Sequence, residues 1–264
     1  MSKFKKLTLA IIIILATIFL ATGFIFYRAY TVPVLMYHFV KPGARPQDRL
    51  AVSVVSFERQ MSFLRRFNYN IVPLEGLARM IKEKRKIPPR TVAITFDDGN
   101  KEDYLYAFPI LRKYSIPATI FLIVNEVGRP RQDKLTWEQV RMMQDSGLIT
   151  VGSHCLGPEP LINLGSVEEL ENEIFGSKRA LEDLLGREVN LFSYPEGRFN
   201  SKIRQLVIDA GYDLAVATNP GKKIPNADLF ALKRLRISAS SDNLFVFWIE
   251  TSGFYNFIRE HRHK

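Results

Sequence analysis

Short apolar runs alternate with helix-like segments along most of this chain, and this alternation constrains the fold more than any other feature. Several helix-like segments end at a glycine, as at Gly147, Gly186 and Gly211. Alternating strands and helices of this length predict parallel pairing with right-handed crossovers, so we expect a distorted or incomplete (β/α) barrel over residues 31–264. The expected strands are 32–37, 91–96, 118–124, 149–153, 190–194 and 213–218, and the expected helices are 57–67, 74–85, 101–114, 136–146, 166–185 and 200–210.

Two of these helices have a capping box at their start. Thr136 with Gln139, and Ser166 with Glu169, have the spacing in which each side chain bonds the other residue's backbone amide. These pairs predict that helices begin directly after Thr136 and Ser166.

The first 30 residues differ from the rest of the chain. Residues 7–27 contain no charge, and such a run is long enough to cross roughly 30 Å of hydrocarbon. The preceding Lys3, Lys5 and Lys6 favour a cytoplasmic amino terminus. We therefore expect residues 1–30 to form a basic tip and a single-pass anchor in the inner or cytoplasmic membrane, with 31–264 as an extracytoplasmic domain. The rival interpretation is a signal peptide cleaved near residues 21–23, which would release a secreted protein.

Charge and cysteine content exclude several other classes of protein. The formal net charge is +10, but four of the 37 basic residues and none of the 27 acidic residues lie in 1–30. The remainder is only mildly basic, and its one candidate basic run, at 82–90, is interpreted as a solvated helix end, so we expect no nucleic-acid partner. The single cysteine, Cys155, excludes an intramolecular disulfide and a four-cysteine zinc site.

Candidate catalytic residues lie at the carboxyl ends of predicted strands. Asp97 and Asp98 follow the strand 91–96, while His38 and His154 follow 32–37 and 149–153. In a barrel these four side chains would meet on one rim, where one carboxylate can bind a metal and another can take a proton from water. The alternative is a solvated Asp-Asp-Gly turn with two structural histidines.

Six motifs in this order resemble the polysaccharide deacetylases of carbohydrate esterase family four. The first motif is also similar to that of the branch containing poly-N-acetylglucosamine deacetylases. The motifs are Val-Leu-Met-Tyr-His at 34–38, Thr-Phe-Asp-Asp-Gly at 95–99, Leu-Thr-Trp-Glu-Gln-Val at 135–140, Val-Gly-Ser-His at 151–154, Phe-Ser-Tyr-Pro-Glu-Gly at 192–197 and Ala-Gly-Tyr at 210–212.

The resemblance implies a role for each matching residue. Asp97 would be the general base, and Asp98 and His154 would bind a divalent metal, with zinc as the first expectation and cobalt or another divalent ion as alternatives. His38 would protonate the departing amine. Tyr194, Pro195, Glu196 and Gly197 would line the pocket, and a backbone amide near Glu196 would stabilise the oxyanion.

Several positions depart from the family pattern. The second metal histidine, normally four positions after the first, is replaced by Pro158. Glu159 is a candidate substitute ligand, with Cys155 and the tail histidines His261 and His263 behind it, and the alternative for Glu159 is a solvated loop acid. Ser193 and Glu196 replace an arginine and an aromatic residue that are common in the third motif.

The sequence therefore leaves two main functional hypotheses. The first is a metal-dependent hydrolase that removes N-acetyl groups from an N-acetylhexosamine polysaccharide, with poly-β-1,6-N-acetylglucosamine ahead of peptidoglycan and chitin-like oligomers. The second is a catalytically impaired glycan-binding or scaffold protein that keeps the fold. Hydrolysis of another amide or ester is a third, weaker alternative.

Overall fold

A computed structural model describes residues 3–45, 47–129, 133–218, 220 and 228–261, and in it a parallel sheet curls into a closed barrel. The sheet order is β1-β10-β9-β8-β7-β6-β5-β4, and β1 pairs with both β10 and β5, which closes the ring and leaves β4 outside it. The (β/α) barrel predicted from the sequence is therefore confirmed, in its closed form. The ring strands are β1 (Val34–Tyr37), β5 (Thr91–Phe96), β6 (Ala118–Leu122), β7 (Ile149–Ser153), β8 (Leu191–Ser193), β9 (Leu214–Thr218) and β10 (Leu232–Arg236).

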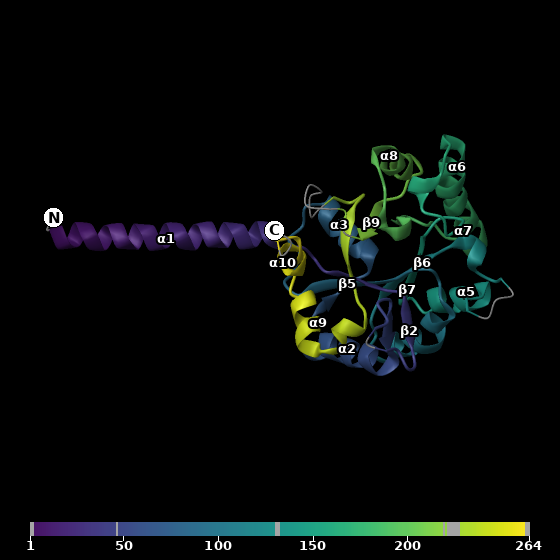
Figure 1. The fold of residues 1–264 in the computed structure, drawn as a ribbon, viewed down its shortest axis with the longest axis horizontal. Coiled ribbons are helices and arrows are strands. Elements are labelled where there is room, and N and C mark those ends of the chain that lie inside the picture. Colours follow the sequence, from purple (N-terminus) through teal and green to yellow (C-terminus); the bar gives the residue numbers. More distant parts are fainter. Residues whose placement is uncertain (1–2, 46, 130–132, 219, 221–227, 262–264) are drawn as a thin grey trace.

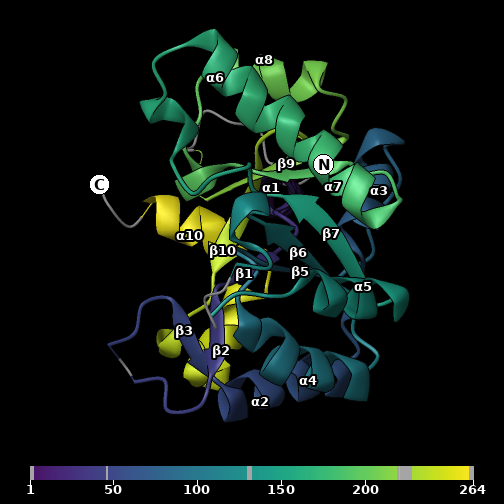
Figure 2. The ribbon, with the colours of Figure 1, turned by 90° about the vertical axis from the view of Figure 1, so that its right-hand side faces the viewer.

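Helices surround the strands on the outside. Figure 2 shows the strands in the middle of the domain, with α2, α4 and α5 on one side and α6, α7 and α8 on the other. The predicted helices are present, with ends shifted by a few residues. Their bounds are α2 (Val54–Arg66), α3 (Leu74–Lys82), α4 (Phe108–Lys113), α5 (Trp137–Asp145), α6 (Val167–Glu171), α7 (Ser177–Leu185) and α8 (Ser201–Asp209).

Local hydrogen bonds explain where two of these helices begin, and two of the predicted helices are interrupted by π-helical turns. Both predicted capping boxes form, since the Thr136 and Ser166 side chains accept from the amides of Gln139 and Glu169. The segment predicted as one helix over 101–114 contains a π-helical turn, Asp103–Ala107, before α4. The segment predicted over 166–185 contains a second one, Asn172–Gly176, between α6 and α7.

Several elements were not predicted. They are β2 (Phe39–Lys41), β3 (Ala51–Ser53), β4 (Asn70–Ile71), β10, α9 (Leu244–Glu250) and α10 (Tyr255–His261), with short 3-10 turns at Val124–Glu126, Leu161–Asn163, Pro195–Gly197 and Ala239–Asp242. The missed strand β10 matters most, because without it the ring cannot close between β9 and β1.

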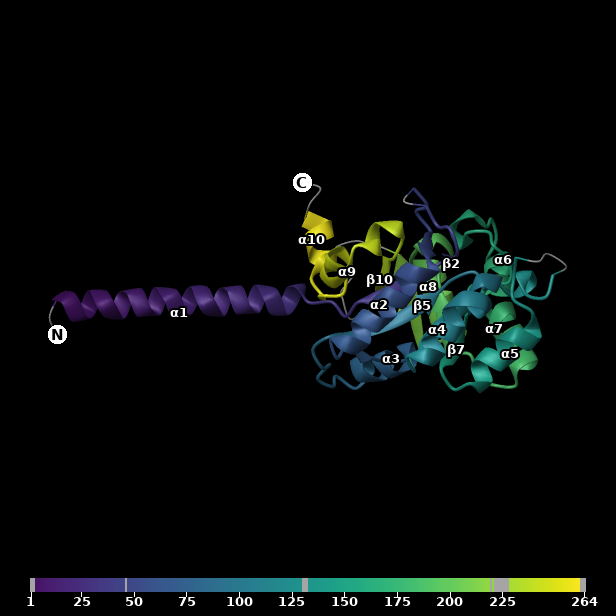
Figure 3. The same ribbon diagram turned by 90° about the horizontal axis from the view of Figure 1, so that it is seen from below.

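A long helix, α1 (Lys3–Ala29), projects from the domain on the side where α10 lies (Figures 1 and 3). Within the residues that the structure describes, no helix is both long and apolar enough for a membrane crossing. The anchor predicted over residues 7–27 is thus not confirmed and stays a prediction.

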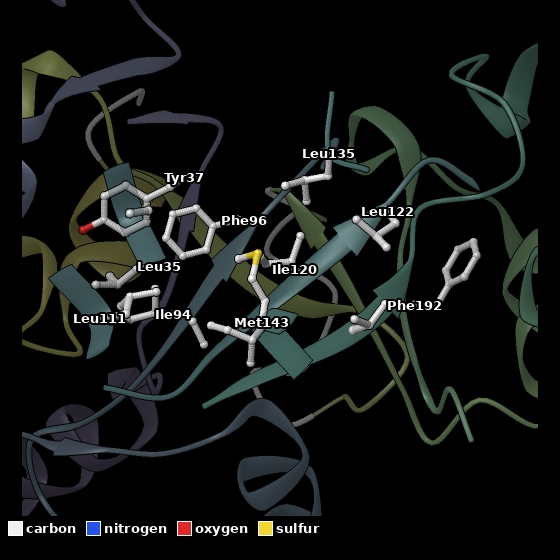
Figure 4. Packing of buried hydrophobic residues seen from close by; sticks show 14 of the residues in the cluster. Leu35, Tyr37, Ile94, Phe96, Leu111, Ile120, Leu122, Leu135, Met143 and Phe192 are labelled. Atoms are coloured by element: carbon white, nitrogen blue, oxygen red, sulfur yellow. The ribbon is translucent and has the colours of Figure 1, made fainter. Parts of the chain in front are cut away.

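The barrel has apolar packing on both faces of its strands. Outward-facing side chains such as Tyr37, Phe96 and Leu122 pack under the surrounding helices (Figure 4). Full burial of side chains of this size contributes about 1.5–3 kcal/mol each. A second cluster fills the inside of the barrel and is covered by α3; its strand members are Val34, Ala93, Phe121, Leu191, Leu214, Val216 and Leu232.

The inside of the barrel changes from apolar to polar along the strands. Because side chains alternate between faces, the inward rows continue two residues at a time toward the carboxyl ends. Val34 is followed by Met36 and His38 in this way, and the rows from Ala93, Leu191, Leu214 and Leu232 end in Asp97, Ser193, Thr218 and Arg236. The polar ends of these rows form one mouth of the barrel.

Candidate active site

A cavity of about 670 Å³ opens at this mouth. Among the described residues, it is lined by each residue to which the resemblance gave a role, whereas the candidate third ligands Glu159 and Cys155 are not part of its wall. The predicted residues on its wall are His38, Asp97, Asp98, His154, Tyr194, Pro195, Glu196 and Gly197. The expectation that two strand-end histidines and two aspartates meet on one rim is therefore confirmed.

Strained backbone positions lie where strands end at this cavity. Asp98, Cys155 and Glu196 have positive φ angles of 74°, 71° and 55°, in a region that non-glycine residues seldom adopt. Gly99 follows with a φ of 61°, and a Cβ there would lie 2.7 Å from Leu122 Cδ2. Strain of this kind is tolerated where the surrounding structure enforces it, and it turns each segment sharply at the cavity.

Asp97 is held by Arg234 of β10, a strand that the local sequence pattern did not predict. Arg234 donates from Nη1 to Asp97 Oδ1 (2.6 Å) and from Nη2 to Oδ2 (2.7 Å), and both side chains are almost completely buried. The guanidinium also donates to Ser193 Oγ (2.9 Å) and Thr95 Oγ1 (3.3 Å). A signal was present, because Arg234 and Arg236 alternate with leucine and isoleucine in a stretch that reads as a strand.

This pairing decides the charge state of Asp97. Burial alone would raise the pKa of Asp97, but the Arg234 guanidinium opposes it, with further contributions from His154 and His38, and the pKa lies below its ordinary value. Asp97 is therefore an ionised carboxylate with a fixed orientation, which a proton acceptor requires.

His154 presents one ring nitrogen to the two aspartates. Its Nδ1 lies 2.8 Å from the Ser193 carbonyl oxygen, so a proton on Nδ1 would be donated there and Nε2 would carry the lone pair. Nε2 lies 3.6 Å from Asp98 Oδ1 and 4.0 Å from Asp97 Oδ2. An imidazole whose other nitrogen donates to a carbonyl is the usual arrangement of a metal-binding histidine, and donors 3.6 Å apart are close enough for one cation to bridge them.

His38 faces the same group from β1. The Asn100 side-chain amide donates to the His38 carbonyl oxygen (3.0 Å), and within the described residues His38 Nδ1 is buried without a partner. Burial lowers the pKa of His38, although Asp97 and Asp98 oppose the change, so the imidazole is largely uncharged at neutral pH.

A third protein ligand for a cation is missing from this part of the wall. Pro158 lines the cavity, but Glu159 does not: it is exposed, and its Oε1 accepts from Asn163 Nδ2 (2.7 Å). Cys155 is buried in the outer cluster, because it follows His154 and points the opposite way. In the described parts of the chain no three His, Cys, Asp or Glu side chains gather as a metal site.

The tail histidines add no donor that the structure describes. His263 lies outside the described residues, and His261 is described only as the last residue of α10. The structure thus brings together the two predicted ligands Asp98 and His154 and leaves Glu159 outside the group.

The segment from Tyr194 to Gly197 forms the far wall. Gly197 has a φ of 69°, and a Cβ there would lie 2.4 Å from the Thr218 backbone nitrogen, so only glycine fits against β9. The Glu196 carboxylate turns to Arg198, 3.2 Å away. Tyr194 is buried, its ring stacks on Phe199 and its hydroxyl donates to the Phe230 carbonyl oxygen (3.0 Å), which leaves that hydroxyl committed to the fold.

Comparison with known proteins agrees with this site. The polysaccharide deacetylase family model matches residues 84–215. The Bacillus subtilis protein YxkH, described as a candidate polysaccharide deacetylase, is 31% identical over 83% of this chain and 76% of its own length. A poly-β-1,6-N-acetyl-D-glucosamine N-deacetylase of Staphylococcus epidermidis is 27% identical over 74% of this chain and 71% of its own length.

A solved structure shows the same architecture. The Streptococcus pyogenes deacetylase PplD, in complex with acetate, superposes with a TM-score of 0.74 at 27% identity, covering 82% of this chain and 97% of its own. The paired aspartates after β5, the strand-end histidines and these matches lead to one conclusion: this chain belongs to the polysaccharide deacetylase family.

Proposed function

We propose that this protein is a metal-dependent N-deacetylase that hydrolyses the acetamido groups of an N-acetylglucosamine polysaccharide. The observation that carries the proposal is the meeting of Asp97, Asp98, His154 and His38 in one cavity, with His154 Nε2 directed at the aspartates. The name of the staphylococcal relative makes poly-β-1,6-N-acetylglucosamine the first substrate to test.

Asp98 and His154 would hold the divalent cation, zinc before cobalt or another ion. Their donor atoms are 3.6 Å apart, and the Ser193 carbonyl fixes the His154 ring in the orientation that a ligand needs. When bound, such a cation polarises the acetamide carbonyl and makes water easier to deprotonate. With two protein donors, the other coordination positions would be open to water and substrate.

The chain's own residues would then move the protons. Asp97 would accept the proton of the attacking water, since Arg234 keeps it ionised and oriented. The backbone amide of Glu196 would donate to the oxyanion of the tetrahedral intermediate, held by the turn that Gly197 allows. His38 would deliver a proton to the departing amine from the fraction of the imidazole that is protonated, and its lowered pKa makes that form the stronger acid.

Residues 7–27 support a proposal on location only through their sequence. We propose that the domain works outside the cytoplasm, tethered by this segment or released after its cleavage.

Acetate release from purified poly-N-acetylglucosamine by the full chain tests the proposed activity. Asp97→Asn is expected to lower turnover by at least about 100-fold, because it removes the proton acceptor. Asp145→Asn is the matched control, since Asp145 is an exposed carboxylate paired with Arg187 far from the cavity. Equal turnover by wild type and Asp97→Asn would refute the role of the base.

One observation favours a second candidate function, a glycan-binding protein that has lost the reaction. The described residues supply two cation donors where a catalytic zinc site usually has three. A folded chain that binds N-acetylglucosamine oligomers but releases no acetate with any added divalent metal would support this alternative.

A further inference from the structure

The charged side chains around the cavity do not balance. Among the residues that the structure describes, four carboxylates line its wall, and three of them are matched by an arginine within the fold. The pairs are Asp97 with Arg234 at 2.6 Å, Glu126 with Arg129 at 2.6 Å and Glu196 with Arg198 at 3.2 Å. Each of these pairs is electrically neutral, so the character of the cavity depends on the charges that remain.

Within the described part of the wall, the remaining charges are Asp98, Lys134 and Arg236. Lys134 Nζ donates to two uncharged oxygens, the Asp98 carbonyl (3.1 Å) and Asn100 Oδ1 (3.0 Å). Arg236 is exposed, lines the cavity, and makes no ion pair or side-chain hydrogen bond with any residue that the structure describes. Two cations therefore stand against one carboxylate, and a divalent ion on Asp98 and His154 would increase the excess.

Arg236 is placed to meet a substrate. It follows Arg234 by two positions on β10, so both side chains extend from the inward face, with Arg236 about 6–7 Å nearer the mouth. It is paired in register with Met36 of β1, the strand that His38 directly follows. A sugar whose acetamide lies between His38 and Asp97 would therefore have Arg236 beside it, toward solvent.

We propose that Arg236 forms an anion subsite, which binds a carboxylate on the polysaccharide next to the sugar that is deacetylated. This inference rests on the proposed function, because it assumes that the cavity receives an N-acetylated glycan. The guanidinium suits a carboxylate through two parallel N–H donors, and Lys134, which lines the same cavity, adds to the positive potential.

Binding of defined oligosaccharides to the full chain tests this subsite whether or not turnover occurs. The neutral probe is an N-acetylglucosamine tetramer. The anionic probes are a hyaluronan tetrasaccharide, which carries uronic acid carboxylates, and a peptide-free muramic acid tetrasaccharide, which carries lactyl carboxylates. Calorimetry at low salt is expected to show at least one anionic probe binding about tenfold more tightly than the neutral one, and high salt should reduce the difference.

Arg236→Ala is expected to abolish this preference while leaving the affinity for the neutral tetramer unchanged, and Arg236→Lys should retain part of it. The matched control is Arg187→Ala, which removes the same charge from an exposed pair outside the cavity. Equal affinities of the wild type for all three probes would overturn the proposal, and so would an Arg236→Ala variant that loses neutral and anionic probes alike. If Arg236→Ala instead made turnover less sensitive to inhibition by acetate and left glycan binding unchanged, Arg236 would bind the acetate product and the proposal would be refuted.

The proposed deacetylase activity and the proposed anion subsite can be refuted independently. A preference for anionic probes without acetate release would retain the subsite and refute the catalytic function. Acetate release with equal affinity for neutral and anionic probes would retain the function and refute the subsite.

Discussion

Replacing Arg234 by methionine tests the arrangement of the site most sharply, because this arginine is the counter-ion of the proposed base. The two side chains share bonds of 2.6 and 2.7 Å and are 1% and 3% exposed. Methionine fills most of the volume but leaves Asp97 buried without its partner. Breaking a buried ion pair in this way costs about 3–5 kcal/mol of unfolding free energy near neutral pH.

The stability that the Arg234–Asp97 pair contributes should depend on pH in a defined direction. In the wild type the pKa of Asp97 lies below 3.8, so the stability from this pair is present above about that pH and is lost as the pH falls through the lowered pKa. In Arg234→Met, burial acts with less opposition and raises the pKa of Asp97. The difference in unfolding free energy between wild type and variant should therefore be largest near neutral pH and shrink below about pH 4.

Urea unfolding followed by circular dichroism measures these free energies, and a double-mutant cycle with Asp97→Asn isolates the pair. The exposed pair Arg187–Asp145, 3.1 Å apart with side chains 56% and 68% exposed, is the control, with an expected coupling below about 1 kcal/mol. A coupling energy between Arg234 and Asp97 no larger than that of the control pair would show that the buried pair does not stabilise the fold as proposed. A loss of stability in Arg234→Met that does not change with pH would show the same.

Three further substitutions, at Asp103, Gly197 and His38, have expected outcomes. Asp103→Asn should raise the melting temperature near neutral pH and not below about pH 4, because burial, with the charges of Asp98 and Glu102, raises the pKa of Asp103 well above 3.8; an unchanged melting temperature would contradict this. Gly197→Ala should lose about 1–3 kcal/mol of stability in urea, since its Cβ would meet the Thr218 nitrogen at 2.4 Å; wild-type stability would show that β9 can move. His38→Gln should lower kcat for acetate release by about 100-fold or more, and an unchanged kcat would remove His38 from the reaction.

The barrel could be predicted because its strands and helices differ in period. The runs at 91–96 and 149–153 match β5 and β7 residue for residue, and the two capping boxes place the starts of α5 and α6 correctly. Strand β10 was missed because Lys233, Arg234 and Arg236 made the segment look polar. Arg234 is buried there because Asp97 satisfies it, a contact between residues 137 positions apart that local patterns do not contain.

The candidate site could be predicted as far as strand ends reveal it. Asp97, Asp98, His38 and His154 are brought together because parallel strands present their carboxyl ends at one mouth. Glu159 lies outside this group in the structure, since it is in an exposed turn and its side chain accepts from Asn163. Whether a loop side chain turns toward a cavity depends on backbone angles that the sequence does not display.

The most direct test of metal-dependent deacetylation measures metal binding and turnover in one preparation. The full chain is freed of metal with a chelator, titrated with zinc or cobalt by calorimetry, and assayed at each step for amine release from N-acetylglucosamine oligomers. Turnover should rise with bound metal. Asp98→Asn should abolish metal binding and turnover, whereas Asp145→Asn should leave metal binding and turnover unchanged. Turnover that survives chelation, or that Asp98→Asn retains, would contradict metal-dependent deacetylation.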